Sequence, residues 1–350
     1  MRVLTYNLWH GLDGKGPLKF GRLEPEDRFK KRMQRQLDDL SELKPDICFL
    51  QEVNPLQERT KKFRKVTGLK SSVQPDLYGL KLLGFGPPFN LQNGLSILFP
   101  STAKLIASKG FRLSGRPFSY ASEAISLQLG ESRHGFYVDV ELESGHRLLL
   151  VTLHLHHGVE FTAEFQRRLS EIFEETQDVD LSAKNQFYLD MQAADLRREQ
   201  ELLRLMDKLP EDLDVYDEVL IGGDFNMTPE SIPYARFERL GFTDCWKRAT
   251  TAPGLSWNLA ANGEVLQLNK QFQQPFNLAK YRFSAPLQSQ LEDALSENED
   301  RARRIDYIWQ MKPKSGLKPK SVFLFGQPKP DQPAGSDHFG VCIDFKWPKA

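Results

Sequence analysis

The chain has 350 residues, of which 40% are hydrophobic and 27% charged, a balance typical of globular proteins with a substantial apolar core. Acidic and basic residues are equal in number, so the net charge is zero and a uniformly basic nucleic-acid-binding surface is excluded, although a local basic patch is not. No apolar run approaches the roughly 18 residues that a membrane-spanning helix needs, and the start of the chain lacks a secretion leader. We therefore expect a monomer without a transmembrane segment, located in the cytoplasm, or secreted if a leader was removed.

Short apolar or β-branched runs recur along the whole chain and predict β-strands. They lie at residues 2–8, 46–52, 94–99, 124–129, 135–142, 147–153, 218–223, 304–310, 321–326 and 340–345. Some alternate apolar and polar residues, as half-buried strands do, and others are apolar throughout, as fully buried strands are.

Helical spacing of apolar residues predicts helices between these strands, over residues 26–43 and 184–209. In the second, the apolar face comprises Leu189, Ala193, Leu196, Leu203 and Met206. A shorter helix is predicted over residues 228–241, with Thr228 as its N-cap and Gly241 at its end.

Strands at both ends of the chain with helices between them favour a single α/β domain over residues 1–350. Two strand-rich layers would pack face to face with helices outside. Two regions read as insertions: residues 155–185, which are polar and helical, and residues 254–300, which are irregular and rich in Gln, Asn and aromatic residues. Loops of this length inside a compact domain are usually functional or disordered.

Polar residues stand where several predicted strands end. The stretch VLIGGDFNMTP, residues 219–229, is an apolar run followed at once by Asp224 and Asn226, which a simple turn would also explain. The same pattern recurs elsewhere, at Asn7, Glu52, His154, Asp306, Asp337 and His338. Each residue alone could be a hydrogen-bonded core residue or a helix cap, but a carboxylate within an apolar strand is costly unless it is paired or bound to a metal.

Together these residues form a coherent set for phosphate chemistry. Carboxylate and amide oxygens suit Mg²⁺, which uses few protein ligands. Histidines can bind phosphate oxygens and carry a proton near neutral pH. The three cysteines show no metal-ligand spacing and no HExxH sequence is present, which argues against zinc.

In chain order, the motifs N, QE, (T)xHL, GDFN, DY and SDH resemble those of the endonuclease/exonuclease/phosphatase superfamily of metal-dependent phosphoesterases. Its members include DNase-like nucleases, abasic-site endonucleases, inositol polyphosphate 5-phosphatases and neutral sphingomyelinases. The resemblance runs from Asn7 to His338. It implies a four-layer α/β sandwich of two mixed β-sheets packed face to face with helices on the outside.

The resemblance also implies roles for the individual residues. Glu52 matches the main ligand of Mg²⁺, for which Mn²⁺ could substitute; Asn7 lies beside it, and Asp337 matches a second metal ligand. His154 and Asn226 match the residues that bind the substrate phosphate. Leu153 stands where the (T)xHL motif often has Thr, with Thr152 one place earlier, so His156 and His157 remain alternatives to His154.

Asp306 matches the residue that orients His338, and Asp224 matches the residue that positions or deprotonates the attacking water. The sequence leaves open whether Asp224 or His338 is the base. With unperturbed pKa values of about 3.9 for Asp and about 6.5 for His, the histidine is the better proton acceptor at neutral pH.

The substrate has three readings. A sphingomyelinase-like phospholipase C, with peripheral contact to a membrane surface, is favoured by the helix between the histidine and GDFN motifs and by the turn after the next helix, which look like those of neutral sphingomyelinases. A nuclease acting on DNA or RNA would want a basic groove, for which only residues 61–65 and 312–320 are candidates. A phosphomonoesterase acting on inositol phosphates would want basic residues near the site, for which only Arg301, Arg303 and Arg304 are available.

The lipid reading predicts that the loops at residues 80–92 and 254–283 flank the pocket and turn aromatic side chains outward. The rings in question are Phe85, Phe89, Trp257, Phe272, Phe276 and Tyr281. The alternative is that they pack as a small core beneath the loops, or stack on nucleic-acid bases.

Overall fold

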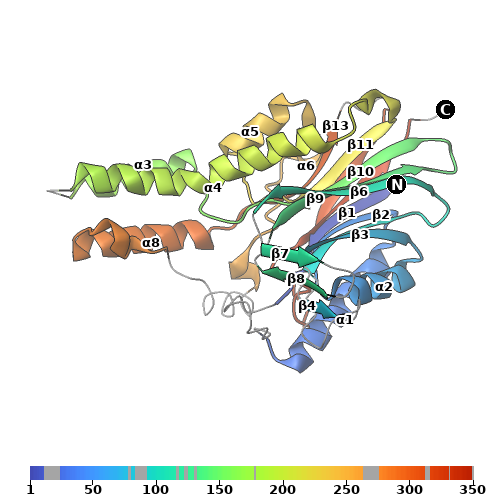
Figure 1. The fold of residues 1–350 in the computed structure, drawn as a ribbon, viewed down its shortest axis with the longest axis horizontal. Coiled ribbons are helices and arrows are strands. Elements are labelled where there is room, and N and C mark those ends of the chain that lie inside the picture. Colours follow the sequence, from blue (N-terminus) through green and yellow to red (C-terminus); the bar gives the residue numbers. More distant parts are fainter. Residues whose placement is uncertain are drawn as a thin grey trace.

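The computed structural model describes residues 1–348 except 12–23, 78–79, 83–92, 116–117, 122–124, 130–131, 177–178, 263–275, 312–315 and 331. Two mixed six-stranded sheets lie at its centre (Figure 1). The first has the order β14-β15-β1-β2-β5-β3 and the second β12-β13-β11-β10-β9-β6, while β4-β8-β7 form a separate small sheet.

The strands of the first sheet are β1 (Arg2–Asn7), β2 (Ile47–Val53), β3 (Lys70–Leu77), β5 (Asn93–Phe99), β14 (Lys318–Phe325) and β15 (Gly340–Lys346). Those of the second are β6 (Lys104–Ser114), β9 (Arg133–Glu141), β10 (Arg147–His154), β11 (Glu218–Asp224), β12 (Phe242–Asp244) and β13 (Asp306–Met311). The small sheet contains β4 (Leu80–Leu82), β7 (Phe118–Ala121) and β8 (Ile125–Leu129). All ten predicted strands are present, with ends within three residues of the predicted ones.

The helices are α1 (Glu26–Leu43), α2 (Leu56–Thr67), α3 (Ala163–Glu174), α4 (Leu181–Lys208), α5 (Ile232–Arg239), α6 (Cys245–Ala249) and α8 (Ala285–Asp300). Among the described residues, short 3₁₀ helices lie at η1 (Leu213–Val215), η2 (Leu259–Asn262) and η3 (Leu278–Tyr281). Within the described residues, no helix has the length and apolar character needed to cross a membrane.

The apolar core lies between the two sheets, where Phe49, Ile97, Phe136, Leu150 and Leu220 are buried together. A second cluster packs α4 and α5 against the outer face of the second sheet, and a third packs α1 and α2 against the outer face of the first. Helix, sheet, sheet and helix thus form four layers, which confirms the predicted α/β sandwich.

The two predicted insertions lie beside the sandwich. In Figure 1, α3, α8 and the first half of α4 project from the sheets as an arm. The arm has its own core, in which Phe173, Phe187, Tyr281 and Leu291 pack together. The region 254–300 is therefore not irregular throughout, because residues 285–300 form α8 with Leu287, Leu291 and Ala294 on its buried side.

Two local predictions were wrong. Helix α5 starts at Ile232 with Ser231 as its N-cap, because the Ser231 hydroxyl, and not that of Thr228, accepts the hydrogen bond from the Tyr234 N–H. In α4 the predicted apolar face is largely exposed: Leu189, Leu196 and Leu203 are 59%, 53% and 42% accessible. The buried face instead contains Phe187, Met191, Leu202 and Leu205 together with charged residues.

Candidate active site

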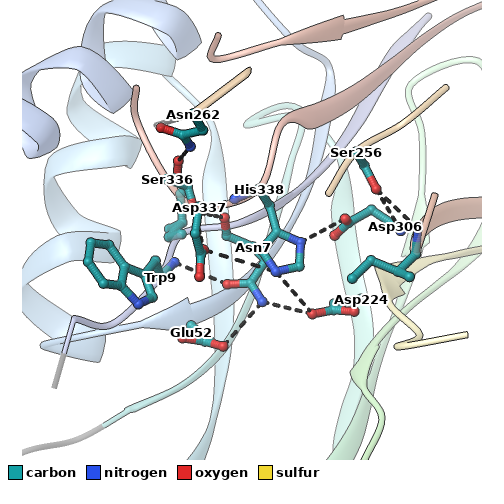
Figure 2. Close-up of polar contacts among 12 residues, drawn as sticks. Asn7, Trp9, Glu52, Asp224, Ser256, Asn262, Asp306, Ser336, Asp337 and His338 are labelled. Carbon is teal, nitrogen blue, oxygen red and sulfur yellow. Dashed lines mark hydrogen bonds and ion pairs between the residues drawn. The ribbon is translucent and has the colours of Figure 1, made fainter. Parts of the chain in front are cut away.

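The predicted site residues gather at one end of the two sheets. Strand β1 runs parallel to β2, and β10 runs parallel to β11, so the carboxyl ends of these strands meet at the same edge. Asn7, His154 and Asp224 are the last residues of their strands, and Asp306 is the first residue of the antiparallel strand β13, directly opposite Asp224. Figure 2 shows most of the set in one cluster.

Asn7 links the two sheets at this edge. Its side-chain amide donates to Glu52 Oε1 at 3.2 Å and to Asp224 Oδ2 at 2.9 Å, while its Oδ1 accepts the Trp9 backbone N–H at 3.0 Å. Asn7 is almost fully buried. The amide therefore holds two carboxylates from different sheets within reach of one ligand.

Glu52, near the end of β2, has an unusual backbone conformation. The register of β2 with β5 shifts between Leu50 and Val53, and Glu52 has a left-handed φ of 53°. A bulge of this kind redirects a side chain out of the regular alternation. Burial alone would raise the pKa of the Glu52 carboxyl, but His10, His154 and the His10 backbone N–H outweigh it and lower the pKa below its ordinary value. Glu52 is thus held as an anion.

Asp306, His338 and Asp224 form a line of interacting side chains. His338 Nδ1 lies 2.8 Å from Asp306 Oδ2, and its Nε2 lies 3.7 Å from Asp224 Oδ2. All three residues are buried, with at most 4% of their surface exposed. Because Asp306 holds Nδ1, the Nε2 side of the ring faces Asp224 and the pocket (Figure 2).

The environment shifts the titration of this pair. Burial lowers the pKa of His338, but the nearby Asp306 and Asp224 carboxylates outweigh it and raise the pKa to about 10. Burial, reinforced by Asp306 and opposed by His338, raises the pKa of Asp224 to about 7. The order expected from unperturbed side chains no longer favours histidine as the base. At neutral pH His338 is therefore protonated, whereas Asp224 gains or loses its proton near that pH.

His154 lies against the same carboxylate. Its Nε2 is 3.4 Å from Asp224 Oδ2, and its Nδ1 is 3.0 Å from an Arg133 guanidinium nitrogen. A guanidinium can only donate, so Nδ1 accepts and the ring hydrogen lies on Nε2, toward the pocket. Burial and Arg133 lower the pKa of His154 well below its ordinary value, which keeps the ring neutral.

The position of Thr152 explains why Thr and His are two residues apart in the (T)xHL motif of this chain. Side chains alternate along a strand, so Thr152 and His154 share the face toward the core, and Leu153 packs in the outer cluster. Thr152 Oγ1 accepts a hydrogen bond of 2.9 Å from Gln51 of the opposite sheet. His156 and His157 lie beyond the strand, where the His156 N–H donates to Glu201 of α4 at 2.7 Å.

Asn226 and Asp337 complete the cluster. Asn226 has a left-handed φ of 48°, its N–H donates to Asp224 Oδ1 at 2.9 Å, and its side-chain amide donates to the Leu155 carbonyl at 3.1 Å. Asp337 Oδ1 accepts from the Ser336 hydroxyl at 3.1 Å and lies 4.0 Å from His338 Nε2. The Ser336 hydroxyl also donates to the Asn7 carbonyl at 2.7 Å, which ties the two segments together.

The donor set fits a hard divalent cation. Three ligand atoms, from Asp224, Asp306 and His338, lie within 4.8 Å of one another, a spacing that a metal could bridge. An imidazolium has no lone pair to offer, however, and the Asp306 carboxylate is engaged by it. Glu52, with a side chain 14% exposed and hydrogen-bonded to Asn7, is the more suitable carboxylate.

Two residues of the segment after α6 reach the pocket: Ser256, which the sequence analysis did not single out, and Trp257, which it placed at the pocket mouth but facing outward. The Trp257 ring packs edge-on against His338, with centroids 4.9 Å apart, and the Ser256 hydroxyl accepts from the backbone N–H groups of Ile305 and Asp306 at 3.1 Å each. Trp257 reaches the site through isolated bridges to Arg303 and His338, in a segment without regular strands. An aromatic residue in an irregular segment carries no periodic signal of its location.

Comparison with known proteins matches residues 4–338 to the model of the Endonuclease/Exonuclease/phosphatase family. The chain belongs to this family. It is therefore a metal-dependent hydrolase of phosphoester bonds. A comparison with curated proteins finds no match.

Solved structures share the fold at low sequence identity. An endonuclease/exonuclease/phosphatase from Bacteroides vulgatus is 15% identical with a TM-score of 0.58, covering 99% of this chain and 98% of that chain. D. rerio TDP2 complexed with a single-strand DNA product is 15% identical with a TM-score of 0.55, at 99% and 98% coverage. The catalytic domain of human Nocturnin with a bound sulfate is 17% identical with a TM-score of 0.50, at 99% and 94% coverage.

The aromatic loops differ from the lipid-facing prediction where the structure describes them. Trp257 and Tyr281 are buried, and Phe276 packs against the core of the arm. Phe85, Phe89 and Phe272 lie outside the described residues. The packing alternative therefore holds for the three rings that can be placed.

Proposed function

We propose that this family member is a Mg²⁺-dependent phosphodiesterase whose substrate is a nucleic-acid strand or another phosphodiester with anionic groups beside the scissile bond. The observation that carries the proposal is the buried line of Asp306, His338 and Asp224, which places a charged donor and a matched acceptor around one space. Glu52, Asn7 and Asp337 would hold the ion. When bound, Mg²⁺ would stabilise the negative charge that develops on the phosphate during the reaction.

The side chains then divide the work of hydrolysis. Asp224 accepts the proton of the attacking water, since the pKa of its carboxyl is raised to about 7 by burial. The His338 imidazolium, oriented by Asp306, donates a hydrogen bond from Nε2 to a phosphate oxygen. As the water oxygen bonds to phosphorus, the ester bond to the leaving alcohol breaks, and the leaving oxygen takes up a proton from solvent. His154 Nε2–H and the Asn226 amide donate to the other non-bridging oxygens, so the charge grows where donors are already in place.

Cationic side chains near the pocket favour an anionic substrate over a zwitterionic lipid headgroup. Arg133 contacts His154. Arg197 of α4 lies near His156, and partial burial together with the charges of Arg197 and Arg133 lowers the pKa of His156 to about 3. The positive electrostatic potential of these arginines attracts ligands that carry several phosphates. The lipid reading lacks comparable support, because Trp257, Phe276 and Tyr281 pack inward. The single-strand DNA in the D. rerio TDP2 structure is consistent with the nuclease reading.

The test is a panel of four substrates: bis-p-nitrophenyl phosphate, a short single-stranded DNA, sphingomyelin vesicles and a phosphatidylinositol phosphate. Each is assayed with Mg²⁺, with Mn²⁺ and with a chelator, and Asp224→Asn serves as the inactive control. We expect metal-dependent cleavage of the diester and the DNA that Asp224→Asn abolishes. Faster turnover of sphingomyelin than of DNA would favour the sphingomyelinase-like hypothesis instead. Cleavage without a metal ion would contradict the proposal.

A further inference from the structure

The contact between Asp306 and His338 crosses from one sheet to the other. Asp306 is the first residue of β13 in the second sheet, and His338 lies two residues before β15 of the first sheet. Both strands are among the described residues, and they share no ladder of backbone hydrogen bonds. The 2.8 Å between His338 Nδ1 and Asp306 Oδ2 therefore depends on what else contacts both segments.

The direction of the Asp306 carboxylate depends on its main chain. Its Oδ2 contacts His338, whereas its Oδ1 is buried and has no hydrogen-bond partner among the described residues. A carboxylate with a single hydrogen bond keeps its direction only if its own backbone is held in place. On one edge of β13 the pairing with β11 ends at Asp306. On the other edge β12 pairs only with Trp309–Met311, so the start of the strand is open there to another partner.

Ser256 and Trp257 contact the start of β13. The Ser256 hydroxyl accepts hydrogen bonds from the N–H groups of Ile305 and Asp306, at 3.1 Å each. Trp257 exchanges two backbone hydrogen bonds with Arg303: its N–H donates at 2.9 Å, and its carbonyl accepts at 2.8 Å. The two residues thus act as a short neighbouring strand for the segment that leads into Asp306.

The same two residues contact the segment that carries His338. The Ser256 carbonyl accepts from the Phe339 N–H at 2.7 Å, and Trp257 forms an isolated bridge with His338. The Trp257 ring stands edge-on to the imidazole, at 71° with 4.9 Å between the centroids. Ser256 is fully buried. One dipeptide therefore ties the start of β13 to the segment that leads into β15.

The Ser256 hydroxyl is the contact that reaches Asp306 directly. A hydroxyl oxygen has two lone pairs and can accept from two neighbouring N–H groups, which a methyl group cannot do. Because protein interiors leave few buried N–H groups unpaired, loss of this acceptor would displace the backbone of Ile305 and Asp306. A displacement of about 1 Å outside the reacting atoms can cost about 10²-fold in rate.

We propose that Ser256 is a positioning residue for hydrolysis. Its hydroxyl fixes the backbone of Asp306 and its carbonyl fixes the segment of His338, so that the two side chains meet with Nε2 of the ring toward the phosphate. The proposal rests on the proposed function, in which the His338 imidazolium binds a phosphate oxygen. Ser256 acts through these two residues and does not bind the substrate.

Three variants test the proposal. Ser256→Ala removes the hydroxyl and adds no atom. Ser256→Cys keeps a side chain of the same connectivity but offers sulfur, which is a weak acceptor, and it serves if Ser256→Ala does not fold. Ser231→Ala is the matched control, because Ser231 is also buried and its hydroxyl accepts a backbone N–H, that of Tyr234 at the start of α5. Its loss should lower the melting temperature without disturbing the catalytic residues.

Kinetics on bis-p-nitrophenyl phosphate with Mg²⁺ separate positioning from stability. We expect Ser256→Ala to lower kcat at least about tenfold, with KM and the half-saturating Mg²⁺ concentration changed less than about threefold, because Glu52 stays in place. Ser256→Cys should lose less, and Ser231→Ala should keep kcat within about twofold. A folded Ser256→Ala enzyme with the kcat of the wild type would overturn the proposal. If that variant does not fold, an unchanged kcat in Ser256→Cys would do so.

An NMR signal tests the positioning without turnover. In protein labelled with ¹⁵N-histidine, the hydrogen on His338 Nδ1 should resonate downfield of the amide region, because it lies in a buried, charge-assisted hydrogen bond to Asp306. We expect the Ser256 variants to shift or abolish this signal and Ser231→Ala to leave it unchanged. If no phosphodiester is cleaved, the proposed function fails, yet an altered signal still supports the positioning role. Turnover by the wild type, with signal and kcat unchanged in the Ser256 variants, refutes the positioning role alone.

Discussion

Replacing Asp306 by Asn keeps the shape of the side chain that orients His338 but removes its charge. The pKa of His338 is raised from 6.5 to about 10 against the effect of burial, with Asp306 as the largest favourable contributor. Removing the Asp306 charge therefore lowers the pKa of His338 and weakens the contact that fixes the Nδ1 side of the ring. Loss of the carboxylate that orients a histidine in acid–base chemistry costs about 10²- to 10⁴-fold in rate.

The assay is kcat/KM for Asp306→Asn on bis-p-nitrophenyl phosphate with Mg²⁺, together with an NMR titration of the His338 ring. We expect a loss of at least about 10²-fold and a pKa of His338 well below that of the wild type. Combining Asp306→Asn with His338→Gln should cost little more than His338→Gln alone, since the two act as a unit. Activity within threefold of wild type, with the His338 pKa still near 10, would refute the reasoning.

The chain offers three further tests. Glu52→Gln should raise the Mg²⁺ concentration needed for half-maximal activity about tenfold or more, and a metal soak that places ions elsewhere would contradict this ligand. Activity should fall as the pH drops below about 7, where Asp224 takes up a proton, and again as the pH rises above about 10, where His338 loses one; a pH–rate profile flat from 6 to 8 would exclude Asp224 as the base. Asp244→Asn leaves Arg304 buried and unpaired, so urea unfolding should show a loss of about 3–5 kcal/mol, whereas the exposed Asp207→Asn should change stability by less than about 0.5 kcal/mol.

The convergence of the site could be predicted from the sequence because it follows from strand geometry. Asn7, Glu52, His154 and Asp224 each come at or near the end of an apolar run, and parallel neighbours bring such ends to one edge. What could not be predicted is the order in which Asp224 and His338 titrate. That order depends on burial and on the distance to Asp306, and a sequence motif indicates neither of these.

Helix α4 shows why a correctly located helix can be given the wrong buried face. The buried face carries Arg198 and Glu201 besides its apolar residues. Arg198 donates to the carbonyls of His156, Gly158 and Val159, and Glu201 accepts the His156 N–H, so these charges hold the segment after β10. Apolar periodicity treats such residues as solvent-facing, and the exposed leucines then look like the core.

Glu52 and Asn226 both adopt the left-handed backbone conformation, with φ values of 53° and 48°. For a residue other than glycine this conformation costs about 1–3 kcal/mol, less for Asn than for Glu. Glycine at either position would relieve the cost and remove a proposed ligand or phosphate donor. A selection for heat resistance alone would thus enrich glycine at the two positions, and the survivors would be sturdier proteins without a working site. Each round of a screen for higher thermostability of this enzyme should therefore also select for catalytic activity.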